Sequence, residues 1–334
     1  SGAVPDSDDT PAAILALLQM RRWLDDRSIA KVDQAVARGK AWLLKLQNRN
    51  GGWPTFCRGW GKLPFDRSST DLTAHAVRAL HSHGGGCEAN DSSAVSSEVA
   101  KATRRAGDFL RRQQRADGSW YPLWFGNQDR EDESNPVYGT SRVLLAVDLV
   151  DLSERSRDRA RDFLLGCQNA DGGWGGGASL ALWLQSAAQR GTPRGQQPAE
   201  VGPDVVASSI EETALAVDAL ATLIQCPRNF EPSSGVQMDR QNRQHVDSDS
   251  FQSAESRPIS TGSGKDACQV AIIRGVEFLL GSVDVGRHRV PWPIGFYFAK
   301  LWYHERLYPL IFAATALGNY LRATADRCDA DWPP

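Results

Sequence analysis

The residues of this chain that could perform acid–base chemistry gather near its beginning, in the stretch VPDSDDTPAAI (residues 4–14). It places Asp6, Asp8 and Asp9 within four positions, directly before a Thr-Pro step. One interpretation is structural, because Asp and Thr favour helix N-caps, Pro suits the first turn and anions stabilise a helix N-terminus. The other is chemical, because crowded carboxylates repel one another and keep at least one of them protonated, as an acid must be.

A second feature is the pattern Leu-x-x-x-Gln-x-x-x-Gly-x-Trp, which occurs three times. Its copies carry these Gln and Trp residues: Gln47 and Trp53, Gln114 and Trp120, Gln168 and Trp174. The apolar residues before each Gln fall at helical spacing, and the Gly steps after it stop the helix and turn the chain. We expect each Gln to bond backbone groups left open at a neighbouring helix end, and each Trp to stack on it. These residues are therefore predicted to tie helices together and to take no part in catalysis. A fourth copy begins at Arg274 and loses the Gln, with Trp292 as its remnant.

Other segments between the repeats are more apolar and are predicted to be buried helices: Thr10–Arg22, Ser69–His83, Tyr138–Val150, Glu211–Ile224 and Arg306–Arg322. Outer amphipathic helices thus alternate with inner apolar ones, and little of the chain has the pattern of a strand. We predict an all-α fold, an α/α barrel with an inner and an outer layer, nearly complete and forming one domain over residues 1–334. Residues 227–265 are polar and Ser/Gln-rich, which predicts a mobile insertion, and residues 185–204 are predicted to form a loop at the rim of an opening.

The bulk composition is that of an ordinary water-exposed globular protein. The 334 residues carry a net charge of −2, so no basic field indicates a nucleic-acid partner. No run of about 18 apolar residues and no signal peptide is evident. The six cysteines are scattered, which predicts free thiols in a reducing compartment. His81, His83 and Cys87 lack the further ligands that a metal site needs, so a polar turn is favoured there.

Together these motifs resemble one enzyme family. The stretches QNRNGGW, QRADGSW and QNADGGW are similar to the QW motifs of triterpene cyclases, and PDSDDT is similar to the D-x-D-D signature of squalene–hopene cyclases and other class II terpene cyclases. Four more stretches resemble the family in the same order: DLTAHAVRAL from Asp71, GSWYPLWFG around Trp124, VYGT at Tyr138 and the aromatic segment 293–321. The resemblance therefore covers nearly the whole chain.

The resemblance implies that the aspartate cluster protonates an alkene, which is a very weak base. It assigns Asp8 as the proton donor and Asp6 and Asp9 as residues that orient and tune it. His75 matches a His that is hydrogen-bonded to the acid and strengthens it; the alternative for His75 is an ordinary buried His in a helix. No cofactor is implied for a hydrocarbon substrate.

The resemblance also implies a cavity in which aromatic faces attract carbocations without acting as bases. For each aromatic residue the alternative is core packing. The residues concerned are Trp124, Tyr138 and Phe296 at matching positions, Phe298, Trp302 and Tyr303 as neighbours, and Trp60 and Phe65 after the first repeat. One departure concerns a Tyr that the family carries in this segment. Its position falls on Lys300, which is then predicted to point outward, or the register is shifted by one residue near Tyr303.

Three functions remain open from the sequence. The first is squalene–hopene-type cyclisation of a small-molecule polyprenyl substrate such as squalene, by an enzyme peripherally associated with the cytoplasmic side of a membrane. The second is a class II diterpene cyclase of the copalyl diphosphate type, which would use Mg²⁺ with a diphosphate substrate. The third is a non-catalytic barrel scaffold. The family has two barrels, so we expect an N-terminal partner barrel, or a second copy in a homodimer, to complete the cavity of this chain. The three repeats favour the first function.

Overall fold

The computed structural model describes residues 5–56, 64–83, 93–191, 207–225, 264–297 and 301–328. Helices dominate this part of the chain, which confirms the all-α prediction. The inner layer consists of α1 (Asp9–Met20), α3 (Thr70–His81), α5 (Pro136–Leu144), α8 (Ile210–Gln225) and α10 (Tyr308–Cys328). The outer layer consists of α2 (Asp26–Leu46), α4 (Ser93–Gln113), α6 (Glu154–Gly166) and α9 (Gly264–Asp284).

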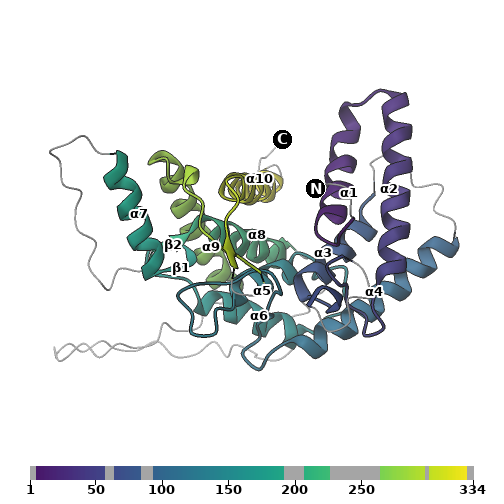
Figure 1. The fold of residues 1–334 in the computed structure, drawn as a ribbon, viewed down its shortest axis with the longest axis horizontal. Coiled ribbons are helices and arrows are strands. Elements are labelled where there is room, and N and C mark those ends of the chain that lie inside the picture. Colours follow the sequence, from purple (N-terminus) through teal and green to yellow (C-terminus); the bar gives the residue numbers. More distant parts are fainter. Residues whose placement is uncertain are drawn as a thin grey trace, which may run out of the picture.

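The inner helices pack neighbour to neighbour in chain order, from α1 through α3, α5 and α8 to α10. Each outer helix lies against an inner one: α2 against α1, α4 against α3, α6 against α5 and α9 against α8. The first pair, α1 and α2, stands apart from α9 and α10 (Figure 1). Since α1 and α10 are not among the closely packed pairs of described helices, the two layers form an arc, as expected of a nearly complete barrel.

The repeated Gln joins successive outer helices. Its side-chain amide donates to the Gly carbonyl of its own turn and to a carbonyl of the next outer helix, as in the 2.8 Å bonds from Gln47 to Gly51 and Ala102. Gln114 bonds Ser156 at 2.8 Å and Gln168 bonds Ala271 at 2.9 Å in the same way. The prediction that each Gln bonds the end of a neighbouring helix was wrong. Ala102 lies in the middle of α4, so the Gln adds a second bond to a carbonyl inside a helix, where we had expected a helix end.

The sequence analysis missed an Arg that completes each tie. Arg105, Arg159 and Arg274 donate to the three Gln side-chain oxygens, at 3.0, 2.7 and 3.2 Å respectively. They also donate to carbonyls of the turn that follows the Gln. Each Arg lies five residues before the Leu of the next copy, so the recurrence was present in the sequence.

The repeated Trp joins the outer layer to the inner one. Its indole N–H donates to the Leu carbonyl ten residues earlier, at 2.7–2.9 Å in the three copies. Its backbone N–H donates to the hydroxyl of Thr73, Thr140 or Thr213, at 3.0, 3.0 and 2.8 Å. The three Trp side chains are fully buried. These three Thr residues therefore occupy equivalent positions in α3, α5 and α8.

Several predicted elements have different bounds. Helix α10 runs on to Cys328, beyond the predicted end at Arg322. Helix α5 ends at Leu144, and turns follow where the prediction continued the helix to Val150. There the Arg157 guanidinium donates to the carbonyls of Val147 and Leu152, which supports an irregular backbone. The predicted loop 185–204 is wrong in its first part, because helix α7 (Ala178–Gly191) extends into it.

Helix α7 starts where Asp129, from a distant loop, accepts bonds from the backbone N–H and hydroxyl of Ser179. This cap comes from tertiary structure, so the local sequence does not reveal it. The predicted insertion 227–265 lies outside the described residues apart from its last two, which already belong to α9.

The described strands are two short antiparallel pairs, β1 (Trp174–Gly177) with β2 (Ala207–Ser209) and β3 (Gly295–Tyr297) with β4 (Leu301–Tyr303). The β3 strand also bridges Phe125, so the loops before the inner helices are joined laterally. Among the described helices, none is long and apolar enough to cross a bilayer.

The Gly of the repeat gives a test of these ties. Gly118 has φ +93°, and a Cβ there would collide with the Arg159 carbonyl oxygen. We expect Gly118→Ala to lower the free energy of unfolding by about 2–4 kcal/mol, through left-handed strain and overlap. Denaturant unfolding measures this. The control is Gly281→Ala, where a Cβ meets nothing within 4 Å in the interior of α9; it should be neutral or stabilise by up to about 1 kcal/mol. Equal effects of the two changes would contradict the described turn.

Candidate active site

Charged side chains line the inward faces of three inner helices. The Thr that bonds the repeat Trp gives a reference point in each helix. The residues that lie two before it, two after it and five after it share one face, because their spacing is i, i+4, i+7. That face is roughly opposite the Thr, which points to the outer layer. The nine residues, called here the inward stripe, are Asp71, His75 and Arg78 on α3, Tyr138 and Arg142 on α5 with Leu145 directly after it, and Glu211, Leu215 and Asp218 on α8.

Within the aspartate cluster, one residue caps the helix and another is left free of capping. Asp6 is the helix cap: its Oδ1 accepts from the backbone N–H of Asp8 at 2.9 Å and of Asp9 at 2.6 Å. Asp8 occupies the N-cap position of α1, yet its side chain makes no capping bond. Ser7 anchors the stretch, because its N–H donates to the Thr55 carbonyl at 2.7 Å. The carboxyl of Asp8 is thus left available for another role.

Burial is the main cause that raises the pKa of Asp8, from 3.8 to about 6. Repulsion by Asp71, Asp6 and Asp9 acts in the same direction, and the charge of Arg142 opposes it. Burial also raises the pKa of Asp6, against the two backbone hydrogen bonds that it accepts. Asp9 is exposed. Of the three aspartates, Asp8 therefore combines partial burial with a carboxyl that is partly protonated near neutral pH.

His75 lies on the inward stripe of α3. The side chain is buried, and its Nδ1 has no hydrogen-bond partner. Burial, followed by repulsion from Arg142 and Arg78, holds the pKa of His75 well below its usual value, against a hydrogen bond between the ring and the Asp8 backbone. The imidazole is therefore neutral. The contact with Asp8 runs through the backbone, where the resemblance had implied a bond to the acid itself.

Arg142 is the cation at the centre of this arrangement. Its Cζ lies 5.9 Å from the centre of the Tyr138 ring, one helical turn away on α5. Burial acts to lower its pKa, but the acidic groups around it, Tyr138, Asp8, Asp71 and Asp218, raise it overall. None of the ion pairs within 4.0 Å among the described residues includes Arg142.

The remaining charges lie above and below Arg142 along the stripe. Burial raises the pKa of Asp71, whose carboxylate accepts from the Ser69 hydroxyl. Burial also raises the pKa of Asp218, against the Asn319 amide, which donates to its Oδ1 at 2.5 Å. The pKa of Arg78 is lowered to about 10 by burial and by repulsion from Arg142.

Two further buried carboxyls lie at the start of α8. Glu211 accepts from the Trp292 backbone N–H at 2.8 Å, and burial raises its pKa to about 7. Glu212 accepts from Gly176 N–H and from the Ser209 hydroxyl, so it pins the β1–β2 loops to the helix. Trp292 is therefore a contact of Glu211, and it lacks the indole bond of the three repeat Trp residues.

Predicted aromatic residues gather beside the inward stripe. Trp124 stacks on Phe65 with ring centres 5.5 Å apart, and its indole N–H donates to Thr55 at 2.6 Å. Tyr138 stacks on Phe125 at 3.8 Å. We call the group to which these side chains belong the aromatic cluster; its buried members are Leu72, Trp124, Phe125, Tyr138, Leu180, Leu215, Trp292 and Ile294, with Phe65, Tyr308 and Phe312 at its edge.

The other predicted aromatic residues are placed differently. Phe296 and Trp302 pair with each other across β3 and β4, with ring centres 4.6 Å apart, outside the aromatic cluster. The Tyr303 ring covers Gly295. Only the backbone of Phe296 reaches the cluster, through a 2.9 Å bond from its N–H to the Trp124 carbonyl. Trp60, Phe298 and Lys300 lie outside the described residues.

Sequence reasoning missed Asp71, Arg78, Arg142, Asp218 and Glu211 as site residues. The available signal was a charge inside a segment that is otherwise Ala- and Leu-rich, repeated at helical spacing. Such charges are almost never fully buried without partners, so their presence in predicted inner helices marks a site.

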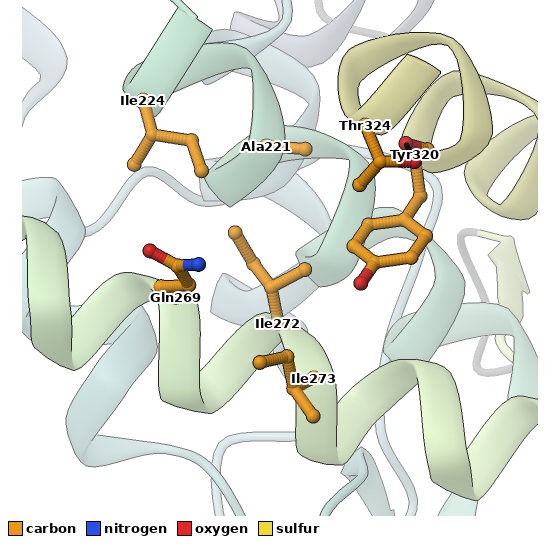
Figure 2. Close-up of a pocket in the computed structure, with 7 residues that line it drawn as sticks. All are labelled: Ala221, Ile224, Gln269, Ile272, Ile273, Tyr320 and Thr324. Carbon is orange, nitrogen blue, oxygen red and sulfur yellow. Dashed lines mark hydrogen bonds between the residues drawn. The ribbon is translucent and has the colours of Figure 1, made fainter. Parts of the chain in front are cut away.

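A small apolar pocket lies away from this site. Residues of α8, α9 and α10 line it, among them Ile224, Ile272 and Tyr320 (Figure 2), and its lining includes no acidic residue. Across the described residues, no group of three or more His, Cys, Asp or Glu side chains is arranged to hold a metal ion.

Comparisons with known proteins agree on one family. Residues 2–197, more than half of the chain, match the sequence model described as "Squalene-hopene cyclase C-terminal domain". A squalene–hopene cyclase from Bradyrhizobium diazoefficiens is 30% identical over 188 residues, covering 51% of this chain and 25% of that protein. A drimenyl diphosphate synthase from Streptomyces showdoensis is 34% identical over 177 residues, covering 52% and 27%. The chain thus spans about a quarter of the length of these relatives.

One solved structure resembles the whole fold. The ent-copalyl diphosphate synthase from Streptomyces platensis superposes with a TM-score of 0.50 at 22% identity, covering 94% of this chain and 41% of that chain. It supports the helical architecture beyond residue 197, where the family match ends.

Because the pKa of Asp8 is raised, replacing its carboxyl by a neutral amide is predicted to increase stability in a pH-dependent way. The folded state binds a proton more tightly than the unfolded one, so the contribution of Asp8 to stability is present below about pH 4 and is lost as the pH rises through about 6. We expect Asp8→Asn to raise the free energy of unfolding by about 1–3 kcal/mol at pH 7.5 and by almost nothing at pH 4. Chemical unfolding at both pH values measures it. Exposed Asp9→Asn is the control, with at most a small loss; a pH-independent effect of Asp8→Asn would refute the assignment.

Proposed function

Because the chain belongs to the squalene–hopene cyclase C-terminal domain family, we propose that it supplies the acid of a class II terpene cyclase, with Asp8 as the proton donor. The single observation that carries this proposal is the division of tasks in the aspartate cluster. Asp6 caps α1, so the carboxyl of Asp8 is free of capping, partly buried and partly protonated near neutral pH.

In the proposed first step, the Asp8 carboxyl transfers its proton to one carbon of a C=C double bond. A C–H bond forms, the π electrons of the alkene are consumed, the other alkene carbon becomes a cation, and Asp8 is left as a carboxylate. Asp6 and Asp9 act indirectly, because their charges raise the pKa of Asp8 and Asp6 fixes the backbone that holds it. Neighbouring double bonds then attack the cation and close rings.

The aromatic cluster suits the steps that follow. Its faces are electron-rich and carry no strong base, so they stabilise a passing cation by roughly 0.5–2 kcal/mol each. Trp124 and Tyr138 are buried members, and each is stacked on a second ring that limits its rotation. We assign these two residues to the cavity wall. Phe296, Trp302 and Tyr303 lie in the adjoining hairpin, and we give them a supporting role.

We favour a linear polyprenyl hydrocarbon as the substrate, in line with the squalene–hopene cyclase relatives and the three repeats. A diphosphate of such a chain is the second candidate, because the drimenyl diphosphate synthase is 34% identical. We also propose uptake at a membrane surface. Exposed apolar side chains lie on β4 and around the start of α10: Leu301, Leu307, Leu310 and Ile311.

Turnover tests the acid directly. This chain, and any longer natural form of the protein, is incubated in detergent with squalene, and separately with geranylgeranyl diphosphate and Mg²⁺, and products are identified by mass spectrometry. We expect cyclic product from one substrate and a loss of about 10²–10⁴-fold in Asp8→Asn. Asp33→Asn, in a surface ion pair on α2, should turn over normally. Unchanged turnover of Asp8→Asn would exclude Asp8 as the donor, and a lack of any product from the longer form would favour a scaffold.

The aromatic wall predicts a change in product rather than in rate alone. Trp124→Leu removes a ring that is 6% exposed and a hydrogen bond to Thr55. We expect a larger share of incompletely cyclised products, because a cation that loses one aromatic face is quenched earlier. Chromatography of the product mixture measures this. Trp23→Leu is the control, since that ring is 68% exposed; an equal redistribution in both variants would argue against the wall.

A further inference from the structure

We propose that Glu211 is the base that ends the reaction: its carboxylate, at the edge of the aromatic cluster, takes the proton that the last carbocation gives up. This role rests on the proposed function of Asp8, because a terminal base is needed only where an acid has started a cationic reaction. Glu211 would contact the reacting atoms, so the role is a catalytic one.

The proposed step balances without a further reagent. A C–H bond beside the cationic carbon breaks, its electron pair becomes the second bond of a C=C double bond, and the proton passes to a carboxylate oxygen of Glu211. Over one turnover Asp8 loses a proton and Glu211 gains one. The product is therefore an isomer of the substrate, and both carboxyls return to their starting states by exchange with water.

Hydrogen bonds fix Glu211 against the loop that carries Trp124. Its Oε1 accepts from the Trp292 backbone N–H at 2.8 Å. Two residues further along, the Ile294 carbonyl accepts from the N–H of Gly126 at 2.8 Å. Trp292, Ile294 and Trp124 are all buried members of the aromatic cluster. The carboxyl therefore lies beside the group of side chains to which we assign the cavity wall.

The same loop is joined to the acid on its other side. The Trp124 indole N–H donates to the Thr55 hydroxyl at 2.6 Å, and the Thr55 carbonyl accepts from the N–H of Ser7 at 2.7 Å. Ser7 directly precedes Asp8. In this series of contacts Trp124 thus lies between Asp8 and Glu211. An acid, an aromatic face and a base in that order suit a charge that is created at one end, stabilised on the way and removed at the other.

The packing of the inner helices separates the two carboxyls. From α1 the layer continues through α3 and α5 to α8, and neighbouring helices lie about 8–10 Å apart. Since α1 and α8 are not among the closely packed pairs of described helices, Asp8 is not placed to take back a proton at α8. The other carboxyls of the inward stripe lie elsewhere. Asp71 is on α3, at the end of the acid, and Asp218 is about 10 Å deeper along α8, where it accepts from Asn319.

The surroundings of Glu211 suit a base. The residue is 1% exposed, so bulk water does not compete for the cation beside it. Burial raises its pKa to about 7, while the Trp292 N–H and the charge of Arg287 act in the opposite direction. A carboxyl with this pKa is ionised in about half of the molecules at neutral pH. A base whose pKa is close to the working pH can both accept a proton and release it again.

The test is the product mixture that Glu211→Gln forms from squalene in water enriched in ¹⁸O, with the chain, or any longer natural form, as in the turnover test. Gln keeps the side-chain length and an oxygen for the Trp292 N–H, but it cannot take a proton. We expect squalene consumption within about threefold of wild type, because Asp8 still starts the reaction. The share of the main alkene product should fall at least about tenfold. Other alkene isomers or ¹⁸O-labelled alcohols should replace it, because the cation persists until another group or water ends it.

Two further variants complete the test. Glu211→Asp keeps the base but withdraws it by one methylene, so an intermediate share of the main alkene is expected; this variant decides the question if Glu211→Gln does not fold. Glu212→Gln is the matched buried control, because Glu212 bonds Gly176 and Ser209, and it should lower stability without changing the product pattern. An unchanged pattern in folded Glu211 variants, or ¹⁸O in the wild-type product, overturns the terminal base and leaves Asp8 standing as the donor. Normal turnover of Asp8→Asn, or no cyclic product from wild type, sinks the proposed function and the terminal base with it.

Discussion

The candidate site depends on one hydrogen bond made three times, from the backbone N–H of a repeat Trp to a Thr hydroxyl on the next inner helix. It fixes the rotation and the height of α3, α5 and α8 against the outer layer. Because the Thr faces outward, the opposite face of each helix must point inward. Every charge of the inward stripe is placed by this constraint, although the Trp itself takes no part in the proposed chemistry.

The inward stripe has no evident value for stability. Burying charges costs several kcal/mol per ion, and buried ion pairs can often be replaced by apolar residues without loss. Here even the compensation is incomplete, because burial raises the pKa of Asp8, Asp71, Asp218 and Glu211. A core built for stability alone would carry aliphatic residues at these positions, as the chain does at Leu145. Perturbed carboxyls held together at a stability cost are typical of functional sites.

The sequence was sufficient for periodic features and for motifs, and insufficient for features made by distant contacts. Helical spacing and the Gln–Gly–Trp repeat predicted two layers of helices, because both are local patterns. The cap of α7 comes from Asp129, some fifty residues away, and the end of α5 is supported by Arg157; neither can be inferred locally. The Trp124 and Tyr138 predictions rested on a family motif, whereas Arg142 matches no motif used, and only the register of three helices reveals its neighbours.

The aspartate cluster contains both a helix cap and a candidate acid, and the first makes the second possible. A helix N-terminus has free N–H groups that stabilise any nearby carboxylate and so weaken its hold on a proton. An acid placed there needs another residue to take up those N–H groups, and Asp6 does so. Asp8 is then left with three opposing influences, namely burial, like charges and one distant cation. Because the first two favour the proton and the third favours its release, the strength of the acid is set by helix packing rather than by the cluster alone.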